Sequence, residues 1–136
     1  LYTNRINPIA DFQGEGVVVW GQKTTQGFAS ALDHVNVARL INHMRWSLDR
    51  MARVFLFEQN DAFTREQAKD MVERYCAGLV SARGLYDFLV VCDESNNTSA
   101  RIDRNELWID IAIQPVKTIE FIYIPIRIRN TGESLG

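Results

Sequence analysis

Two amphipathic segments in the middle of the chain constrain its fold more than any other feature. Between residues 36 and 55, and again between 68 and 80, apolar side chains recur every three or four positions. This period places them on one face of a helix. They are Val37, Leu40, Ile41, Met44, Leu48, Met51, Val54 and Phe55 in the first segment, and Ala68, Met71, Val72, Tyr75, Leu79 and Val80 in the second. The sequence therefore predicts two helices, the first about 20 residues and ~30 Å long.

The residues that flank these segments indicate where each helix begins. Asp33 or Asn36 is expected to cap the first helix, because short polar side chains accept hydrogen bonds from the first free N–H groups. Asn60-Asp61 interrupts the apolar pattern. Thr64, with Gln67 three residues later, has the spacing of a capping box and is expected to open the second helix.

Two strands are expected after the second helix, which should end at Gly84 because helix C-termini favour a left-handed residue there. Residues 85–92 are apolar on both faces, which is typical of a central strand. Residues 93–106 are predicted as a polar loop. Residues 107–114 alternate apolar and polar side chains, as a half-buried strand does. Residues 118–129 are expected to return beside them as the second strand of a hairpin.

These segments together predict an α+β domain, with two helices packed on one face of a small, mainly antiparallel sheet and with terminal arm segments. Residues 1–16 are turn-rich and are interpreted as an extended lead-in, and residues 17–20 as a short β run. We expect an α+β core over residues 17–124. Residues 125–136 are expected to form a C-terminal strand or arm and a tail.

Composition excludes several classes of protein. Fifteen basic against seventeen acidic residues give a net charge of −2, so no overall positive field attracts nucleic acid or an acidic membrane surface. Apolar runs such as residues 17–20 and 89–92 are far shorter than the ~20 residues that span a bilayer. We therefore expect neither nucleic acid nor membrane as a partner. Two cysteines allow one disulfide at most, and we expect reduced thiols in a cytosolic setting.

Few residues offer catalytic or metal-binding chemistry. His34 and His43 are nine positions apart and do not form the i, i+4 pair of a helical metal site. Cys92-Asp93 lies at the end of a predicted strand, where α/β enzymes often place catalytic groups, but no helix follows at once to lower the pKa of the thiol. Cys76 has no partner at a useful spacing. We expect no catalytic residue, no metal and no cofactor, and keep a small α+β enzyme using Cys92 or Asp93 as an alternative.

Two further short motifs are better explained by ordinary loops and turns than by ligand binding. Residues 93–103 carry several oxygen ligands but lack the glycine and the regular alternation of a calcium loop, so a solvated loop is favoured. Gly14-Glu15-Gly16 precedes a strand, whereas a phosphate-binding glycine loop follows one and opens a helix.

Association explains the remaining features better than chemistry does. The first helix carries Arg39, Arg45, Arg50 and Arg53, which form either a solvated outer face or an electrostatic surface for an acidic partner. The isoleucine-rich residues 118–129 would aggregate as a free edge strand, and Pro125 removes one backbone donor in the middle of them. We expect residues 118–124 to pair with 107–114 in the same chain. The intersubunit strand is expected to comprise Ile126, Arg127, Ile128 and Arg129.

Short residue groups along nearly the whole chain support a family assignment. They are Asn7-Pro8-Ile9, Phe12, Gly14, Gly16-Val17, Trp20-Gly21, Lys23-Thr24, Asn36-Val37, Arg39-Leu40, Phe57-Glu58, Asn60-Asp61, Phe63-Thr64, Gly84, Asp87-Phe88, Val90, Cys92-Asp93, Asn96-Asn97-Thr98, Pro115, Ile119 and Phe121-Ile122. In this order and spacing the chain resembles the C-terminal domain of contractile bacteriophage tail sheath proteins. One departure is Ala38, where many relatives carry a second Arg beside Arg39.

The resemblance implies a structural protein without enzymatic activity. Such subunits form hexameric rings that stack around a tail tube, join the baseplate, and contract to drive the tube through a host envelope. The C-terminal domain is the inner layer, and terminal arms add strands to neighbouring sheets. The implied location is the virion tail, assembled in the host cytoplasm. A sheath from a related bacteriocin or secretion apparatus is the alternative. Family subunits are longer than 136 residues, and the chain begins at Leu1 without Met, so we expect a fragment.

Overall fold

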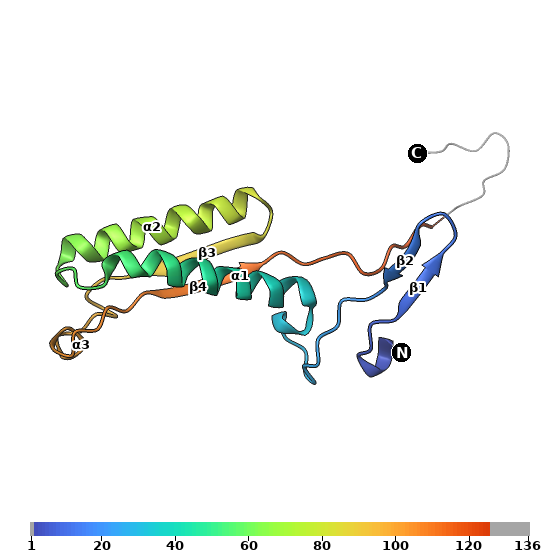
Figure 1. Ribbon diagram of the computed structural model, residues 1–136, viewed down its shortest axis with the longest axis horizontal. Helices are drawn as coiled ribbons and strands as arrows, with labels where there is room; N and C mark the ends of the chain where they lie inside the picture. Colours follow the sequence, from blue (N-terminus) through green and yellow to red (C-terminus); the bar gives the residue numbers. More distant parts are fainter. Residues whose placement is uncertain (1, 126–136) are drawn as a thin grey trace.

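The computed structural model describes residues 2–125 and shows an elongated molecule with two structured ends (Figure 1). At one end, two long helices cover a two-stranded sheet. At the other end lies a small β-hairpin, which extended segments connect to the helical layer. The predicted α+β class is confirmed, with two small antiparallel sheets in place of one.

The first long helix, α1, spans Val35–Ala52 and continues as a 3-10 turn, η3, over Arg53–Phe55. Its apolar period is the one that the sequence predicts. The expected caps are wrong: His34 is the N-cap residue and makes no side-chain capping bond. Asp33 belongs to a preceding 3-10 turn, η2, Ala31–Asp33, which Ser30 caps. Asn36 instead donates from its Nδ2 to the carbonyl oxygen of Val116 at 3.3 Å.

The second helix, α2, spans Ala62–Ser81. Its N-cap is Asp61, whose carboxylate accepts from the Thr64 backbone N–H at 2.8 Å. The predicted capping residue, Thr64, is therefore the third residue of the helix. The bonds with Thr64 favour the ionised carboxylate and lower the pKa of Asp61.

The C-terminus of α2 is a Schellman motif centred on Arg83. The Arg83 N–H donates to the carbonyl of Val80, and the Gly84 N–H to that of Leu79. Arg83 has a φ of 62°, so the left-handed residue is this arginine and not the predicted Gly84. The chain then enters β3 directly.

Strand β3, Leu85–Val91, pairs with β4, Asp110–Pro115, in antiparallel register with Phe88 opposite Ile113 and Val90 opposite Ile111. Met44, Val72, Cys76, Leu85 and Val90 form the core between this sheet and the helices. Side chains of β4 alternate between half-buried and exposed, as the sequence predicts.

Two strand predictions are wrong. Within residues 2–125, β3 pairs with β4 alone, so it is not a central strand. The apolar side chains of β3 therefore belong to a two-stranded sheet and not to the middle strand of a larger sheet. The predicted hairpin of residues 107–114 with 118–124 does not form: β4 pairs with β3 on one edge, its other edge has no partner within residues 2–125, and residues 116–125 carry no strand. Ile126 to Arg129 lie outside the described residues.

The predicted lead-in is more regular than expected. Strand β1, Ile9–Phe12, pairs with β2, Gly16–Val19, across the predicted boundary at residue 17. Gly14 and Gly16 supply the positive φ angles, 91° and 80°, that the tight connection needs. No helix within residues 2–125 is both long and apolar enough to cross a bilayer.

Candidate assembly surfaces

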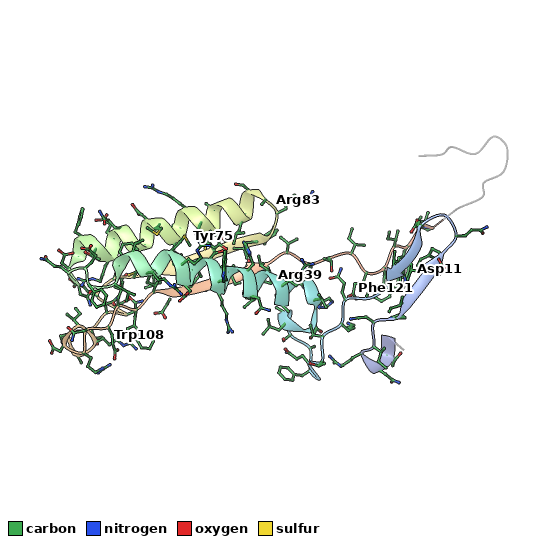
Figure 2. All side chains as sticks on the ribbon, in the orientation of Figure 1. Asp11, Arg39, Tyr75, Arg83, Trp108 and Phe121 are labelled. Atoms are coloured by element: carbon green, nitrogen blue, oxygen red, sulfur yellow. The ribbon has the colours of Figure 1, made fainter. Side chains whose placement is uncertain are left out.

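Large apolar side chains are exposed at the hairpin end of the molecule. The term hairpin end denotes β1, β2 and residues 117–125, which run from β4 toward the hairpin (Figures 1 and 2). Ile9 is 72% exposed, Val17 71% and Ile122 78%. Their neighbours Val19, Trp20, Ile119, Phe121, Tyr123 and Ile124 are exposed as well. Contiguous exposed apolar groups of this kind mark interaction sites.

The extended residues 117–125 are anchored at the N-terminus of α1. The Val116 N–H donates to the carbonyl of Gly84 at 3.4 Å. Further along, His34 places its Nε2 2.9 Å from a carboxylate oxygen of Glu120, while its Nδ1 contacts Asp33. His34 therefore links residues 117–125 to the start of α1.

The hairpin is attached through Asn7. Its side chain donates to the carbonyl of Lys23 and accepts from the Lys23 N–H, both at 2.8 Å. Gly21 lies against this pair, since a Cβ there would meet Asn7 Oδ1 at 2.6 Å. The hairpin is thus positioned by one short polar junction, whereas Phe12 and Trp20 pack their rings 4.7 Å apart within it.

The four predicted arginines are all exposed on or just after α1. Arg50 lies over the ring of Trp46 at 4.7 Å, and Arg53 pairs with Asp49 at 2.8 Å. Arg39, labelled in Figure 2, lies near the other end of the helix, and Arg45 lies between. Sequence reasoning missed Trp46, which is 60% exposed and lies in the same stripe as Arg39 and Arg50. Trp46 is seven residues from Arg39 and four from Arg50, and this helical spacing is the signal by which the sequence could have identified it.

The candidate catalytic residues are not brought together. Cys92 is buried, which raises the pKa of its thiol, and its side-chain contact is the amide of Asn97. Asp93 is held by the hydroxyl and N–H of Ser95, which lower the pKa of its carboxyl. Cys76 is buried in the core, and burial likewise raises its pKa. Among residues 2–125, no group of three His, Cys, Asp or Glu side chains is placed to hold a metal ion.

The predicted polar loop is a compact structure built around two buried asparagines. Asn97 accepts from the Trp108 N–H at 2.8 Å and donates to the Trp108 carbonyl at 2.9 Å. Asn96 donates to the carbonyl of Val91 and to the carboxylate of Asp110. The short helix α3, Ser99–Asp103, follows and places Arg101 over the ring of Trp108 at 3.9 Å. Sequence reasoning missed this arrangement because two of the partners, Trp108 and Asp110, lie 11–14 residues from the amides.

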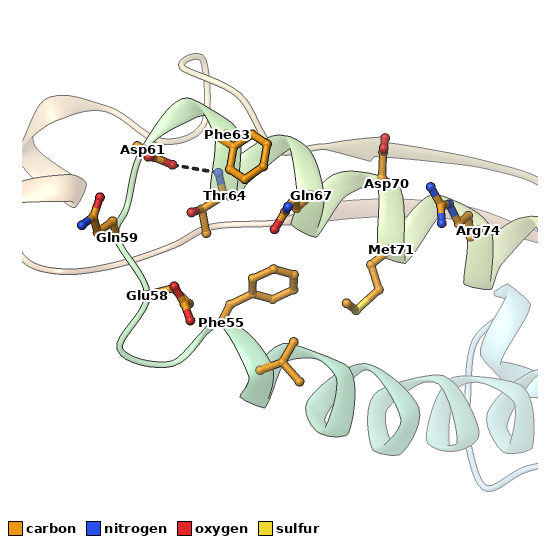
Figure 3. Close-up of a pocket in the computed structure, with 11 residues that line it drawn as sticks. Phe55, Glu58, Gln59, Asp61, Phe63, Thr64, Gln67, Asp70, Met71 and Arg74 are labelled. Atoms are coloured by element: carbon orange, nitrogen blue, oxygen red, sulfur yellow. Dashed lines mark hydrogen bonds between the residues drawn. The ribbon is translucent and has the colours of Figure 1, made fainter.

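A hollow of about 800 Å³ lies where the chain turns from α1 to α2 (Figure 3). Phe55 and Met71 point into the space between the helices, with Glu58 at one side. Phe57, in the same turn, has a φ of 70° and a fully exposed ring. This end of the helical layer therefore also presents apolar groups to solvent.

The comparison with known families identifies the family to which the chain belongs. Residues 29–129 match the phage tail sheath C-terminal domain. The chain belongs to the phage tail sheath family. The apolar side chains exposed at both ends of the molecule are surfaces suited to association.

Relatives and solved structures agree with this assignment. The chain is 44% identical to the tail sheath protein of Vibrio phage KVP40 over 122 residues, 90% of this chain and 18% of that protein. It is 38% identical to the tail sheath protein of Enterobacteria phage T4, over 97% of this chain and 20% of that protein. Its fold resembles the sheath complex of an extracellular contractile injection system, PVC, in its contracted state, with a TM-score of 0.82 and 24% identity. That match covers 91% of this chain and 37% of the PVC chain. The chain thus spans about a fifth of the length of the phage sheath proteins.

Proposed function

We propose that this chain is the inner, tube-proximal domain of a contractile tail sheath subunit. The observation that carries the proposal is the hairpin end, whose apolar side chains remain exposed in a single copy. Leaving so many such groups in water is unfavourable, and burial against a neighbour would stabilise a polymer at about 25 cal/mol per Å² of apolar area. Membership of the sheath family supports this use of the surface.

The complete subunit would form hexameric rings that stack around the tail tube and attach to the baseplate. Contraction of the stack would drive the tube through the host envelope. Its place would be the virion tail, after assembly in the host cytoplasm, and its role structural rather than enzymatic. The buried thiol of Cys92, with its raised pKa, disfavours the alternative of a small enzyme.

Strand addition is the proposed means of connecting subunits. Residues 125–136 would form an arm beyond the 17–124 core, and Ile126, Arg127, Ile128 and Arg129 would pair with a sheet of the neighbouring subunit. Both described sheets are two-stranded, which supports the proposal because each has edges without a partner in residues 2–125. Main-chain hydrogen bonds would hold the subunits together while each domain turns as a rigid body. Burying two isoleucines would contribute about 3–6 kcal/mol per junction.

The exposed arginines are proposed as an electrostatic contact. Arg39, Arg45, Arg50 and Arg53 would face an acidic partner, which is either the tube or the adjacent subunit. Exposed ion pairs contribute only about 0.2–1 kcal/mol each, so several arginines would act together.

Electron microscopy of the full-length protein tests the function. Tubular polysheath is expected from the intact subunit, and dispersed particles would contradict the proposal. Deletion after Pro125 should leave the helical core folded, because its buried residues all lie upstream, but rings should no longer stack into long sheaths. Normal sheaths from the truncated protein would remove the arm from the mechanism.

A sheath from a bacteriocin or secretion apparatus is the second candidate. The similarity of the fold to a contractile injection system sheath favours it, whereas the identity to phage sheath proteins is higher. Both candidates predict polysheath, and they differ in whether the particle carries a genome.

A further inference from the structure

The exposed face of α1 forms a regular basic and aromatic stripe. Arg39, His43, Trp46, Arg50 and Arg53 follow one another at intervals of four, three, four and three residues, which places them in one row on the helix. The row is about 21 Å long. All five side chains are exposed, and Asp49 is the acid that pairs with it, through Arg53. We call this row the basic face.

The helix α2 carries the opposite charge on one flank. Glu66, Asp70 and Glu73 follow at intervals of four and three residues, so they also form one row. They line an open hollow of about 540 Å³, together with Asp93 and Glu94 from the segment after β3. We call this row and these two carboxylates the acidic flank.

The cations of the same hollow do not cancel this charge. Arg65 is buried and donates to the carbonyl and the side-chain oxygen of Asn60. Lys69 lies 3.9 Å from Glu73 and offsets one carboxylate. Five carboxylates thus stand against one accessible ammonium group and one buried guanidinium.

The basic face and the acidic flank are not paired with each other within residues 2–125. The hollow at the α1–α2 turn is lined by Asp70, Met71 and Arg74 of α2, together with Phe55. Asp70 therefore borders both hollows, whereas Glu66 and Glu73 line only the hollow beside the segment after β3. The ion pairs of the two rows are Arg53 with Asp49 and Lys69 with Glu73, so no ion pair joins one row to the other among these residues, and both present charge to another molecule.

We propose that the basic face of α1 in one copy docks against the acidic flank of α2 in the next copy. This inference rests on the proposed sheath function and names the partner of the arginines as a second copy of the chain. The charges are complementary, and Trp46, exposed beside Arg50, supplies the kind of aromatic anchor that is enriched at interface centres. Because the two surfaces differ, the contact is heterologous and repeats from copy to copy, as rings and helical arrays require.

A charge exchange in the full-length subunit tests the pairing. Arg39→Glu with Arg50→Glu, and separately Glu66→Arg with Asp70→Arg, should each raise the protein concentration needed for polysheath at least about tenfold at low salt. The four substitutions combined in one chain should restore assembly, since every contact again joins opposite charges. Arg74→Glu with Arg83→Glu is the matched control for the arginine variant, with the same charge change on exposed residues outside both rows and outside the hairpin end.

Other outcomes would overturn the pairing. If both double variants failed and the combined one did not recover, each row would have a different partner. If the arginine variant formed normal free polysheath but no longer bound tubes, the partner would be the tube. If neither variant changed assembly while the wild type formed polysheath, the sheath function would stand and this contact would be wrong.

Cross-linking gives a second measurement that does not depend on charge. Arg50→Cys is combined in one chain with Glu66→Cys, Asp70→Cys or Glu73→Cys. A bis-maleimide should join the thiol at position 50 of one copy to the second introduced thiol of another copy, giving a ladder of covalent multimers in polysheath. Cys76 and Cys92 are buried and give little background. Monomers alone from all three pairs, with assembly intact, would overturn the proposal.

Discussion

The two ends of the molecule use the same kinds of apolar residue in opposite ways. In the helical layer Cys76, Leu85 and Val90 are at most 3% exposed. At the hairpin end Ile9, Val17 and Ile122 remain mostly in water. The difference teaches that the helical layer has its own core, whereas the hairpin end is built for a neighbour. The chain thus combines a part with its own core and a part that, under the proposed function, a neighbouring subunit would cover.

The largest effect is expected when one buried side chain of the helical layer is shortened and compared with one exposed side chain of the hairpin end. Leu85→Ala should lower the free energy of unfolding by about 2–5 kcal/mol, since it opens a cavity in the core. Ile122→Ala should leave the stability of the unassembled protein within about 0.5 kcal/mol, because the side chain is exposed, and should impair polysheath. Denaturant unfolding and microscopy measure the pair. Equal loss of stability in both variants would erase the distinction between the two ends.

The next effect concerns the buried amides at the far end of the helical layer. Asn97→Leu should cost about 1–3 kcal/mol, because the Trp108 N–H loses its partner and the Trp108 carbonyl keeps only the bond from Asn96 Nδ2 at 3.2 Å. Chemical denaturation measures this loss, with the exposed Asn42→Leu as the control. A cost no greater than that of the control would show that the loop does not need the amide.

A smaller effect is expected at the junction of the hairpin. Gly21→Ala places a Cβ 2.6 Å from Asn7 Oδ1, and the forced shift should cost about 1–3 kcal/mol locally. Amide hydrogen exchange should become faster in β1 and β2 and stay unchanged in α2 and β3. Gly27→Ala, with open space around its Cβ, is the matched control. Faster exchange throughout the molecule would mean that the ends are coupled.

The smallest effect is a change in pH dependence. Arg104 and the indole N–H of Trp108 bind the ionised carboxylate of Glu106 and lower its pKa to about 2. A lowered folded-state pKa means that this group stabilises the fold at a pH above its unfolded pKa, and that the contribution is lost as pH falls from about 4.5 toward 2. Glu106→Gln should flatten the acid side of a stability profile measured by thermal unfolding at several pH values. An unchanged profile would assign the acid sensitivity to other carboxylates.

Local patterns predicted the helices well. The period of Val37, Leu40 and Met44 depends only on side chains within one helix, so it is readable without knowledge of the rest of the molecule. The exposed arginines of α1 follow from the same period. The helix ends were less predictable, because several neighbouring residues suit each terminal position equally well. The residues that the structure places there are Ser30, Asp61 and Arg83.

Long-range pairing was not predictable in the same way. An isoleucine-rich run after a strand suits a hairpin as well as an extended arm, and in the structure residues 116–125 leave the second edge of β4 without a partner within residues 2–125. The Asn96 and Asn97 side chains likewise bind groups far along the chain. The polar composition of this segment therefore predicted a solvated loop where the structure has an ordered one. The two charged rows were visible as compositions, but the hollow that brings Glu66, Asp70 and Glu73 together with Asp93 and Glu94 was not.

The sequence by itself determined the two amphipathic helices, the alternation of β4, and the family. These properties come from the order of side chains along one element, where each residue meets neighbours three, four or two positions away. Only the tertiary structure decided that β3 pairs with β4 alone, that residues 116–125 leave the sheet, and that one end keeps its apolar groups in water. Those outcomes depend on competition between distant segments for the same backbone edges and the same apolar surface, which no local pattern records.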